Sequence, residues 1–392
     1  MVENATEIPR ATCRLFGAIK AASTLRNSVI LVHGPKGCVY HINYILGMRG
    51  DRVSPVFSTC LDENDVVFGA ERKLKDAIEE LDARRSPEIL VVLSCCASSI
   101  IGEDVQGAIA SASTRAVVIG IDAGGFAGDY TEGYADTLLR IVEVCSGAGS
   151  GPNPRKVNLL GVLRAGPDVR ELRRLLSLIG VEVIAVLPAG ASVDDLSHLG
   201  EASLNIVLCE TSGLSAARYL GEKYGTPFLV AEFPVGLKSS RDFLLQVSES
   251  LGFTGDLPIP DLPEPLPLKG KLPRIAIVSG PTRAVSLTRF LSSHGIAPRL
   301  IVLDFDSGSR EKVAAAAGPG CVVLVSPEWD EIRKRLEEEQ IEVLIGGMME
   351  RPLASELGIR LLDIMHGSQK TAGPGGGENL LRLILQGNGQ KE

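Results

Sequence analysis

The chain has 392 residues, of which 45% are hydrophobic, 22% are charged and only 4% are aromatic. Its net charge of −8 disfavours nucleic acid as a partner, because phosphate binding needs a Lys- and Arg-rich face. No uncharged apolar run reaches the roughly 18 residues of a membrane span, and the N-terminus lacks a signal-peptide core, so we expect a cytoplasmic protein without a membrane partner.

Strand-length apolar runs alternate with segments of helical periodicity along the whole chain, which predicts parallel sheets with crossover helices. Two Gly- or Pro-rich segments, Ser146–Arg155 and Gly255–Pro273, interrupt the pattern and are predicted linkers. We therefore expect an α/β protein of three Rossmann-like domains, covering residues 1–150, 151–262 and 263–392.

The predicted elements follow the same scheme in each domain. In the first domain the predicted strands are Val29–Val32, Ile89–Leu93 and Ala116–Ile121, and the predicted helices lie near Asp65–Leu81 and Gly133–Val144. In the second they are strands Val157–Val162, Val181–Val186, Asn205–Leu208 and Phe228–Val230, with helices near Asp168–Ile179, Leu214–Tyr224 and Arg241–Leu251. In the third they are strands Ile275–Val278, Arg299–Leu303, Val322–Val325 and Val343–Ile345, with a helix capped by Ser326 and ending near Glu339.

Ligand sites in such sheets lie beyond the C-terminal ends of the strands, and four predicted strand ends carry a thiol or an imidazole. They are the HGPKGC segment His33–Cys38, then Ser94-Cys95-Cys96, Cys209-Glu210 and Met365-His366. Iron–sulfur clusters and transition metals prefer such ligands. No Cys-x-x-Cys pair occurs, so the ligands would have to converge from separate segments, unlike those of a zinc ribbon.

Four segments of the first domain form a specific combination. They are CRLFGA at Cys13–Ala18, HGPKGC, ENDVVFGAE at Glu63–Glu71 followed by Lys73-Leu74, and CASSIIGED at Cys96–Asp104. This combination resembles the component 1 family of nitrogenase. That family also contains cofactor-assembly scaffolds, the light-independent protochlorophyllide reductase and the reductive cyclase of the nickel tetrapyrrole of methanogens. The resemblance covers essentially the whole chain.

The resemblance implies that Cys13, Cys38 and Cys96 hold a [4Fe–4S] or larger iron–sulfur cluster at a subunit interface, which makes residues 1–150 the cluster-binding domain. Gly34 and Gly37 flank a Pro-Lys turn that could bring backbone N–H groups near an anionic cluster. Taken alone, HGPKGC fits equally well a tight turn with a buried cysteine.

The remaining cysteines leave alternatives open. We interpret Cys95 as the neighbour of a ligand, because adjacent side chains on an extended segment face opposite ways. Cys60 precedes the ENDV segment and is either a fourth cluster ligand or a core thiol. Cys145 and Cys321 lie in or beside apolar runs and are predicted to be small hydrophobic residues.

A fainter resemblance concerns a second site. The segment ending at Cys209, with EKYGTP at Glu222–Pro227, resembles the nitrogenase segment whose cysteine holds one end of the active-site metal cluster. Met365-His366 followed by Gly373-Pro374 resembles the segment whose histidine holds the other end. The pair implies a second, complex Fe–S cofactor. The spacing after His366 and the missing aromatic residues depart from the family, so an ordinary hydrogen-bonded histidine is the alternative.

The resemblance implies electron transfer from a separate NifH-like ATP-dependent iron protein. No Walker A pattern occurs, so the ATPase would be another polypeptide. One full set of cluster cysteines favours a homodimer, with a homologous second subunit as the alternative.

Two interpretations of the substrate remain. The chain length favours reductive cyclisation of Ni-sirohydrochlorin a,c-diamide in the biosynthesis of coenzyme F-430, the cofactor of methanogenesis. The Cys209 and His366 pair favours a nitrogenase-like reductase, similar to methylthio-alkane reductase, or a cofactor-assembly scaffold. A carboxylate-rich tetrapyrrole would need cationic partners. The candidates for this role are Lys36, Arg49, Lys238 and Arg241.

Overall fold

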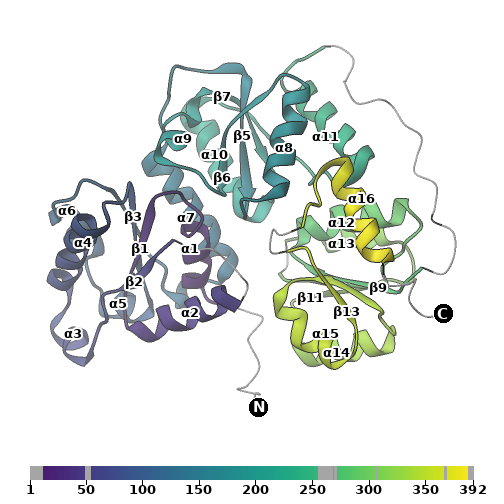
Figure 1. Cartoon of the computed structure of the whole chain (residues 1–392). Coiled ribbons are helices and arrows are strands. Elements are labelled where there is room, and N and C mark those ends of the chain that lie inside the picture. Colours follow the sequence, from purple (N-terminus) through teal and green to yellow (C-terminus); the bar gives the residue numbers. More distant parts are fainter. Residues whose placement is uncertain are drawn as a thin grey trace. The chain divides into compact units, whose positions relative to one another are not determined.

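The structure is a computed structural model that describes residues 12–48, 54–254, 268, 272–305, 307–365 and 369–386. Within these ranges the chain forms three parallel sheets covered by helices (Figure 1), which confirms the predicted α/β fold. The chain divides into two compact units. The N-terminal compact unit contains Ala11–Ala165 and Val183–Val230, and the C-terminal compact unit is built around Gly166–Glu182 and Ala231–Glu392.

The first sheet has the strand order β2-β1-β3-β4. Its strands are β1 (Ser28–His33), β2 (Val56–Ser58), β3 (Ile89–Ser94) and β4 (Val117–Ile121). Its helices are α1 (Arg14–Ala22), α2 (Lys36–Met48), α3 (Glu63–Phe68), α4 (Glu71–Arg85), α5 (Cys96–Ile101), α6 (Val105–Ser111), the 3-10 turn η1 (Gly125–Ala127) and α7 (Tyr130–Cys145). Strands β1 and β3 are buried along their whole length, as expected for central strands covered on both faces.

The strands of this sheet end level with one another. His33 pairs with Ser94 at the ends of β1 and β3, and Val32 pairs with Ser58 at the end of β2. Because all the strands run parallel, the loops that follow them emerge at one edge of the sheet. This edge carries the cysteines of the first domain apart from Cys145, which ends α7.

The predicted helix near Asp65–Leu81 is wrong as a single element, because the structure has two helices there. Gly69 ends α3 with a φ of 84°, in the region that favours glycine. Asp62 caps α3 through the N–H groups of Asn64 and Asp65. The ENDV segment is therefore a short helix of its own at the cysteine-bearing edge.

The second sheet has the order β6-β5-β7-β8. Its strands are β5 (Asn153–Val162), β6 (Glu182–Pro188), β7 (Ala202–Val207) and β8 (Phe228–Val230). The helices of this part of the chain are α8 (Pro167–Leu178), α9 (Val193–Ser197), the 3-10 turn η2 (Leu199–Glu201), α10 (Glu210–Tyr224) and α11 (Gly236–Ser250). The predicted linker Ser146–Arg155 ends earlier than expected, because β5 already begins at Asn153.

The third sheet has the order β11-β10-β9-β12-β13. Its strands are β9 (Ile275–Ser279), β10 (Leu300–Leu303), β11 (Val322–Val325), β12 (Val343–Gly346) and β13 (Arg360–Asp363). Its helices are α12 (Pro281–Ser293), α13 (Arg310–Ala317), α14 (Trp329–Glu338), the 3-10 turn η3 (Met348–Glu350), α15 (Arg351–Glu356) and α16 (Gly373–Leu385).

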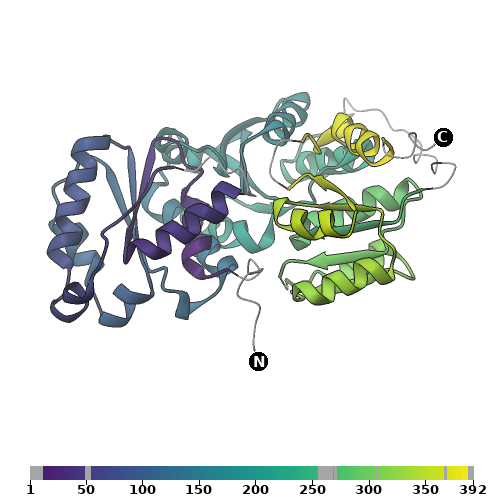
Figure 2. The same ribbon diagram turned by 60° about the horizontal axis from the view of Figure 1, so that its bottom comes forward.

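Helices cover both faces of this third sheet, as Figures 1 and 2 show. Alternate residues of β9 pack into opposite cores: Ile275 and Ile277 pack with α12, α13 and α16, whereas Ala276 and Val278 pack with α14 and α15. The predicted cap of α14 is wrong, because Glu328 rather than Ser326 stands at its N-cap. Most of the predicted linker Gly255–Pro273 lies outside the described residues.

No helix in the described part of the chain combines the length and the apolar character that crossing a membrane requires.

Candidate metal centre

Three helices begin at the cysteine-bearing edge of the first sheet, and each carries a cysteine at its start. Cys13 is the N-cap of α1, Cys38 lies in the first turn of α2, and Cys96 is the first residue of α5. The N-terminus of a helix carries a partial positive charge that favours thiolates and anionic groups. The local folding of the chain thus presents three sulfurs in an environment suited to an anionic cluster.

Gly125, the first residue of η1, brings two of these cysteines together. Its backbone N–H donates to Cys96 Sγ at 3.1 Å. A Cβ at Gly125 would lie 3.2 Å from Cys96 Sγ and 3.3 Å from Cys13 Cβ. Cys38 is close enough for its thiol to interact electrostatically with both Cys13 and Cys96. The structure therefore gathers the three cysteines predicted from the sequence, and it adds a glycine that the sequence did not single out.

The three cysteines face outward to different degrees. Cys13 is exposed, and Cys38 and Cys96 are partly buried. Within the described residues, no three His, Cys, Asp or Glu side chains are grouped to hold one metal ion. A single ion needs thiolates within about 2.3 Å of one point, whereas a cluster distributes its thiolates over several irons. Because Cys13 is exposed, the group of cysteines is open to solvent on that side.

Cys95 lies on the inner side of this site and is only 1% exposed. Its thiol forms a hydrogen bond with Cys38, and this contact lowers the pKa of Cys95 to about 5. The same hydrogen bond and burial raise the pKa of Cys38.

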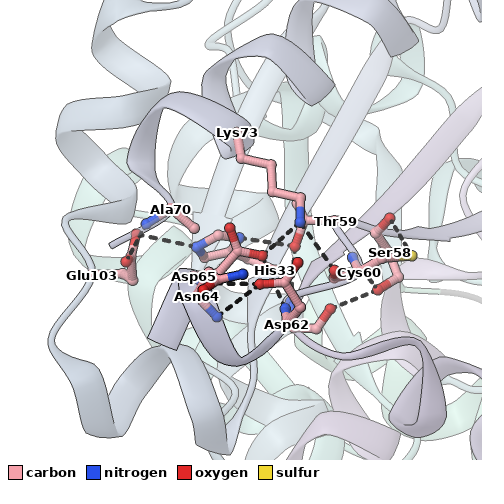
Figure 3. A network of polar contacts seen from close by, with 11 residues as sticks. His33, Ser58, Thr59, Cys60, Asp62, Asn64, Asp65, Ala70, Lys73 and Glu103 are labelled. Carbon is pink, nitrogen blue, oxygen red and sulfur yellow. Dashed lines mark hydrogen bonds and ion pairs between the residues drawn. The ribbon is translucent and has the colours of Figure 1, made fainter. Parts of the chain in front are cut away.

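A buried polar network lies beneath the edge and links the cysteine-bearing loops (Figure 3). His33 Nδ1 contacts Thr59 Oγ1 at 3.0 Å, and His33 Nε2 contacts Glu103 Oε2 at 3.3 Å. Thr59 Oγ1 also accepts from Gly34 N–H at 3.1 Å, and Glu103 Oε1 accepts from Ala70 N–H at 2.7 Å. The network joins the loop before Cys38, the loop that carries Cys60 and the turn after α5.

Cys60 itself is exposed and does not lie in the core. Its φ of 54° is unusual for a residue with a side chain. Ser58 Oγ accepts from Cys60 N–H at 2.9 Å, and Lys73 Nζ donates to the Cys60 carbonyl at 3.0 Å and to Asp65 at 2.6 Å. These contacts, visible in Figure 3, hold the loop in its left-handed conformation.

Cys209 is the N-cap of α10, and a single residue separates it from the end of β7. A Cβ at Gly161 would lie 3.0 Å from Cys209 Cβ, so only glycine leaves room there. The hydroxyl of Tyr134, from α7, is buried without a hydrogen-bond partner among the described residues. Burial raises the pKa of Tyr134, and the nearby Tyr130 and Cys209 raise it further. An unused buried donor beside a cysteine fits a bound polar or anionic group.

The other predicted site residues are less informative. His366 and Arg49 lie outside the described residues. Lys36 and Lys238 are exposed, and Arg241 is partly buried.

In the C-terminal compact unit, Asp168 of α8 accepts from the N–H groups of Thr371 at 2.7 Å and Ala372 at 2.8 Å, which fixes the segment before α16.

The two cysteines predicted to play a hydrophobic role behave differently from those of the site. Burial raises the pKa of Cys145 and of Cys321 to about 11. Both thiols therefore stay protonated at neutral pH, as expected for unreactive structural cysteines.

Parallel α/β sheets thus place cysteines at the start of three helices, an arrangement suited to an iron–sulfur protein. The family described as nitrogenase component 1 type oxidoreductase matches residues 13–387. The chain belongs to this family. Its members bind iron–sulfur clusters, and they work with an ATP-dependent iron protein, often as oligomers.

Individual relatives span several activities. The chain is 28% identical to the nitrogenase iron-molybdenum cofactor biosynthesis protein NifE of Clostridium pasteurianum, covering 92% of this chain and 83% of that protein. It is 27% identical to one of the subunits of the light-independent protochlorophyllide reductase of Rubrivivax gelatinosus, covering 88% and 68%. The solved structure titled "Nitrogenase Cp1 at pH 6.5" superposes with a TM-score of 0.82 at 20% identity, over 100% of this chain and 96% of that one, which shows a shared fold.

Proposed function

We propose that this chain is the cluster-carrying component of a two-component reductase, with Cys13, Cys38 and Cys96 as ligands of a [4Fe–4S] or larger cluster. The observation that carries the proposal is the convergence of these cysteines at three helix N-termini around Gly125. When bound, the cluster supplies one-electron transfer from a separate NifH-like iron protein. The chain's residues hold the cluster and shield its inner side.

Metal analysis of the full chain tests this assignment. Protein purified without oxygen should contain about four irons and four sulfides per [4Fe–4S] cluster. Replacing Cys13, Cys38 or Cys96 by Ala should remove most of the iron. The matched controls Cys145→Ala and Cys321→Ala should keep it, because both thiols are protonated structural cysteines. Full iron content in all three ligand variants would overturn the assignment.

A second subunit should cover the open side of the cluster. Large apolar side chains are exposed on the helices that start at the cysteine-bearing edge. They are Tyr40, Tyr44, Val66, Val67, Phe68, Ile100 and Phe126. Exposed apolar groups of this kind mark interaction surfaces, and twofold pairing is the commonest closed symmetry. They support a homodimer, or pairing with a homologous subunit, and Cys60 is the remaining candidate for a fourth ligand from within the chain.

For the substrate, we propose reductive cyclisation of Ni-sirohydrochlorin a,c-diamide in coenzyme F-430 biosynthesis. The single set of cluster cysteines supports it, and so does the similarity to a subunit of a protochlorophyllide reductase, whose name also specifies a tetrapyrrole substrate. The exposed Lys36, in the first turn of α2, is a candidate partner for a substrate carboxylate.

One observation favours a different function. The unpartnered Tyr134 hydroxyl near Cys209 supports a second, complex Fe–S cofactor held by Cys209 and His366. The chain would then be a reductase similar to methylthio-alkane reductase, or a scaffold for cofactor assembly. The similarity to the cofactor biosynthesis protein NifE supports the scaffold version.

The two functions predict different bound groups and different amounts of iron in the purified protein. With the tetrapyrrole function, Ni-sirohydrochlorin a,c-diamide should bind with a shift of its visible bands, and Cys209→Ala should leave the iron content unchanged. With the second cofactor, iron should exceed the content of the interface cluster. Cys209→Ala and His366→Ala should each remove that excess, and neither should affect the first cluster.

A further inference from the structure

One cysteine at the candidate metal centre has no role in the proposed cluster. Cys95 is the N-cap of α5 and lies behind the loop that joins β1 to α2. Its N–H donates to Ser98 Oγ at 2.9 Å, and that hydroxyl lies 3.9 Å from Cys95 Sγ. These contacts hold the sulfur in one position at the end of β3.

The loop from β1 closes directly over this sulfur. A Cβ at Gly34 would overlap Cys95 Sγ, so glycine is required for the loop to approach so closely. The register His33 to Ser94 places the two strand ends next to each other. The Cys38 thiol then forms a hydrogen bond with that of Cys95. The two thiols therefore lie within hydrogen-bonding reach on neighbouring loops, and a disulfide needs its two cysteines close together.

We propose that Cys38 and Cys95 form a reversible disulfide in the cluster-free protein, by exchange with a low-molecular-weight disulfide. Cys38 is partly buried, whereas Cys95 is buried, so Cys38 meets the oxidant first. Cys38 passes its proton to Cys95, and the Cys38 thiolate attacks the small disulfide. The released small thiolate takes up that proton, which leaves Cys95 as a thiolate. Cys95 then attacks the Cys38 sulfur of the mixed disulfide and releases the second. Two protein thiols and one small disulfide thus become one protein disulfide and two small thiols.

The disulfide would make cluster loading dependent on reduction. A sulfur engaged in a disulfide is not a thiolate and does not bind iron. The bond also protects Cys38 from stepwise oxidation to sulfinic acid, which is irreversible without a dedicated enzyme. This consequence for loading rests on the proposed role of Cys38 as a cluster ligand, whereas the pairing of the two sulfurs does not.

The first test maps the disulfide in the full-length chain. Cluster-free protein is treated with oxidised glutathione, alkylated, and digested for mass spectrometry. We expect one crosslinked pair of peptides containing Cys38 and Cys95, a loss of two thiols from the total of eight, and full recovery with dithiothreitol. A stable glutathione adduct on Cys38 with a free Cys95 would overturn the proposal, as would pairing of Cys38 with Cys13 or Cys96.

Two variants complete this test. Cys95→Ser keeps the size of the buried side chain. In this variant the exchange reaction should stop at the glutathione adduct on Cys38. Cys145→Ser is the matched control, and its protein should form the same disulfide as the unchanged chain. A disulfide between Cys38 and another cysteine of the chain in the Cys95→Ser variant would contradict the assignment.

Reconstitution with iron and sulfide separates this inference from the proposed function. Oxidised protein should take up cluster iron only after dithiothreitol is added. If the disulfide forms and iron uptake is nevertheless normal, Cys38 is not a ligand and the proposed function fails while the disulfide stands. If no disulfide forms and Cys38→Ala still loses its iron, the inference fails and the proposed function stands.

Discussion

Gly125 shows how one residue without a side chain can determine a metal site. Its N–H is bonded to Cys96 Sγ, and a Cβ there would come within 3.4 Å of atoms of both Cys96 and Cys13. A side chain at this position would press on two of the proposed ligands at once.

We therefore expect Gly125→Val to lower the iron content of the anaerobic protein by more than half, because its larger side chain displaces Cys13 or Cys96. The measurement is iron per chain after purification. The matched control is Gly47→Ala in α2, where an added Cβ meets nothing within 4 Å and alanine suits a helix better than glycine. Equal iron content in the two variants would contradict this role of Gly125.

Tyr134 offers a test on stability alone. Its hydroxyl is buried and unpartnered in the described structure, and such a group costs about 1–3 kcal/mol. We expect Tyr134→Phe to raise the midpoint of urea unfolding of the cofactor-free protein. Tyr224→Phe should lower this midpoint, because the Tyr224 hydroxyl donates to the Ser146 carbonyl at 2.8 Å. A lower midpoint in Tyr134→Phe would mean that the hydroxyl has a partner in solution.

The sequence was informative about some of these residues and silent about others. Cys13, Cys38 and Cys96 stand in recognisable segments at strand or helix ends, so they could be found. Gly125 and Tyr134 could not, because their roles depend on contacts between segments far apart in the chain. The only local signal was the pair Gly124-Gly125 shortly after a predicted strand.

At the scale of elements, the loops at the cysteine-bearing edge depend on one buried carboxylate. Glu103 contacts His33 of β1 and accepts from Ala70 N–H, at the start of α4. It therefore connects the end of β1, the start of α4 and the turn after α5 (Figure 3).

We expect Glu103→Ala to destabilise the fold by about 2–4 kcal/mol, because both partners are left buried and unpaired. Glu103→Gln keeps the shape and should recover at least half of this loss. The exposed ion pair of Glu356 with Arg333 provides the control, since Glu356→Ala should cost less than about 1 kcal/mol. Urea unfolding followed by circular dichroism measures all three, and equal losses for the two alanine variants would contradict the role of Glu103.

Sequence periodicity predicted the central strands closely and the helix starts less well. The runs of Val, Ile and Leu in β1, β3 and β9 are buried on both faces, so they stand out in the sequence as continuous apolar segments. Helices α10 and α11 begin earlier than expected, at Glu210 and Gly236, because small polar residues and glycine in their first turns hide the helical pattern. The break at Gly69 depends on a positive φ, which periodicity does not register.

At the scale of the whole molecule, the exposed apolar side chains around the cysteine-bearing edge predict an assembly. Phe126 is 78% exposed and follows Gly125 directly, and Phe68 is 83% exposed at the end of α3. Two aromatic rings this exposed near one edge are unfavourable in water unless a partner covers them.

We expect the cluster-loaded protein to be a dimer, and Phe126→Asp to weaken the dimer at least tenfold, because a charge would then be buried in an apolar interface. Sedimentation at several concentrations measures the dissociation constant. Leu178→Asp, at an apolar position of α8 that is 40% exposed and belongs to the other compact unit, should leave it unchanged. A stable, cluster-loaded monomer of the unchanged chain would contradict the prediction.

The pairing of Cys13 with Asp129 has a consequence for the order in which the protein is made. Cys13 forms an antiparallel bridge with Asp129, and Tyr130 N–H donates to the Thr12 carbonyl. A cysteine from the beginning of the chain therefore reaches its place only after the segment up to α7 has been synthesised and folded. Contacts so distant in sequence form late. A ribosome-bound fragment that ends before Asp129 would carry Cys13, Cys38 and Cys96 as separate thiols, and assembly of a metal centre on this chain is thus a step that follows folding.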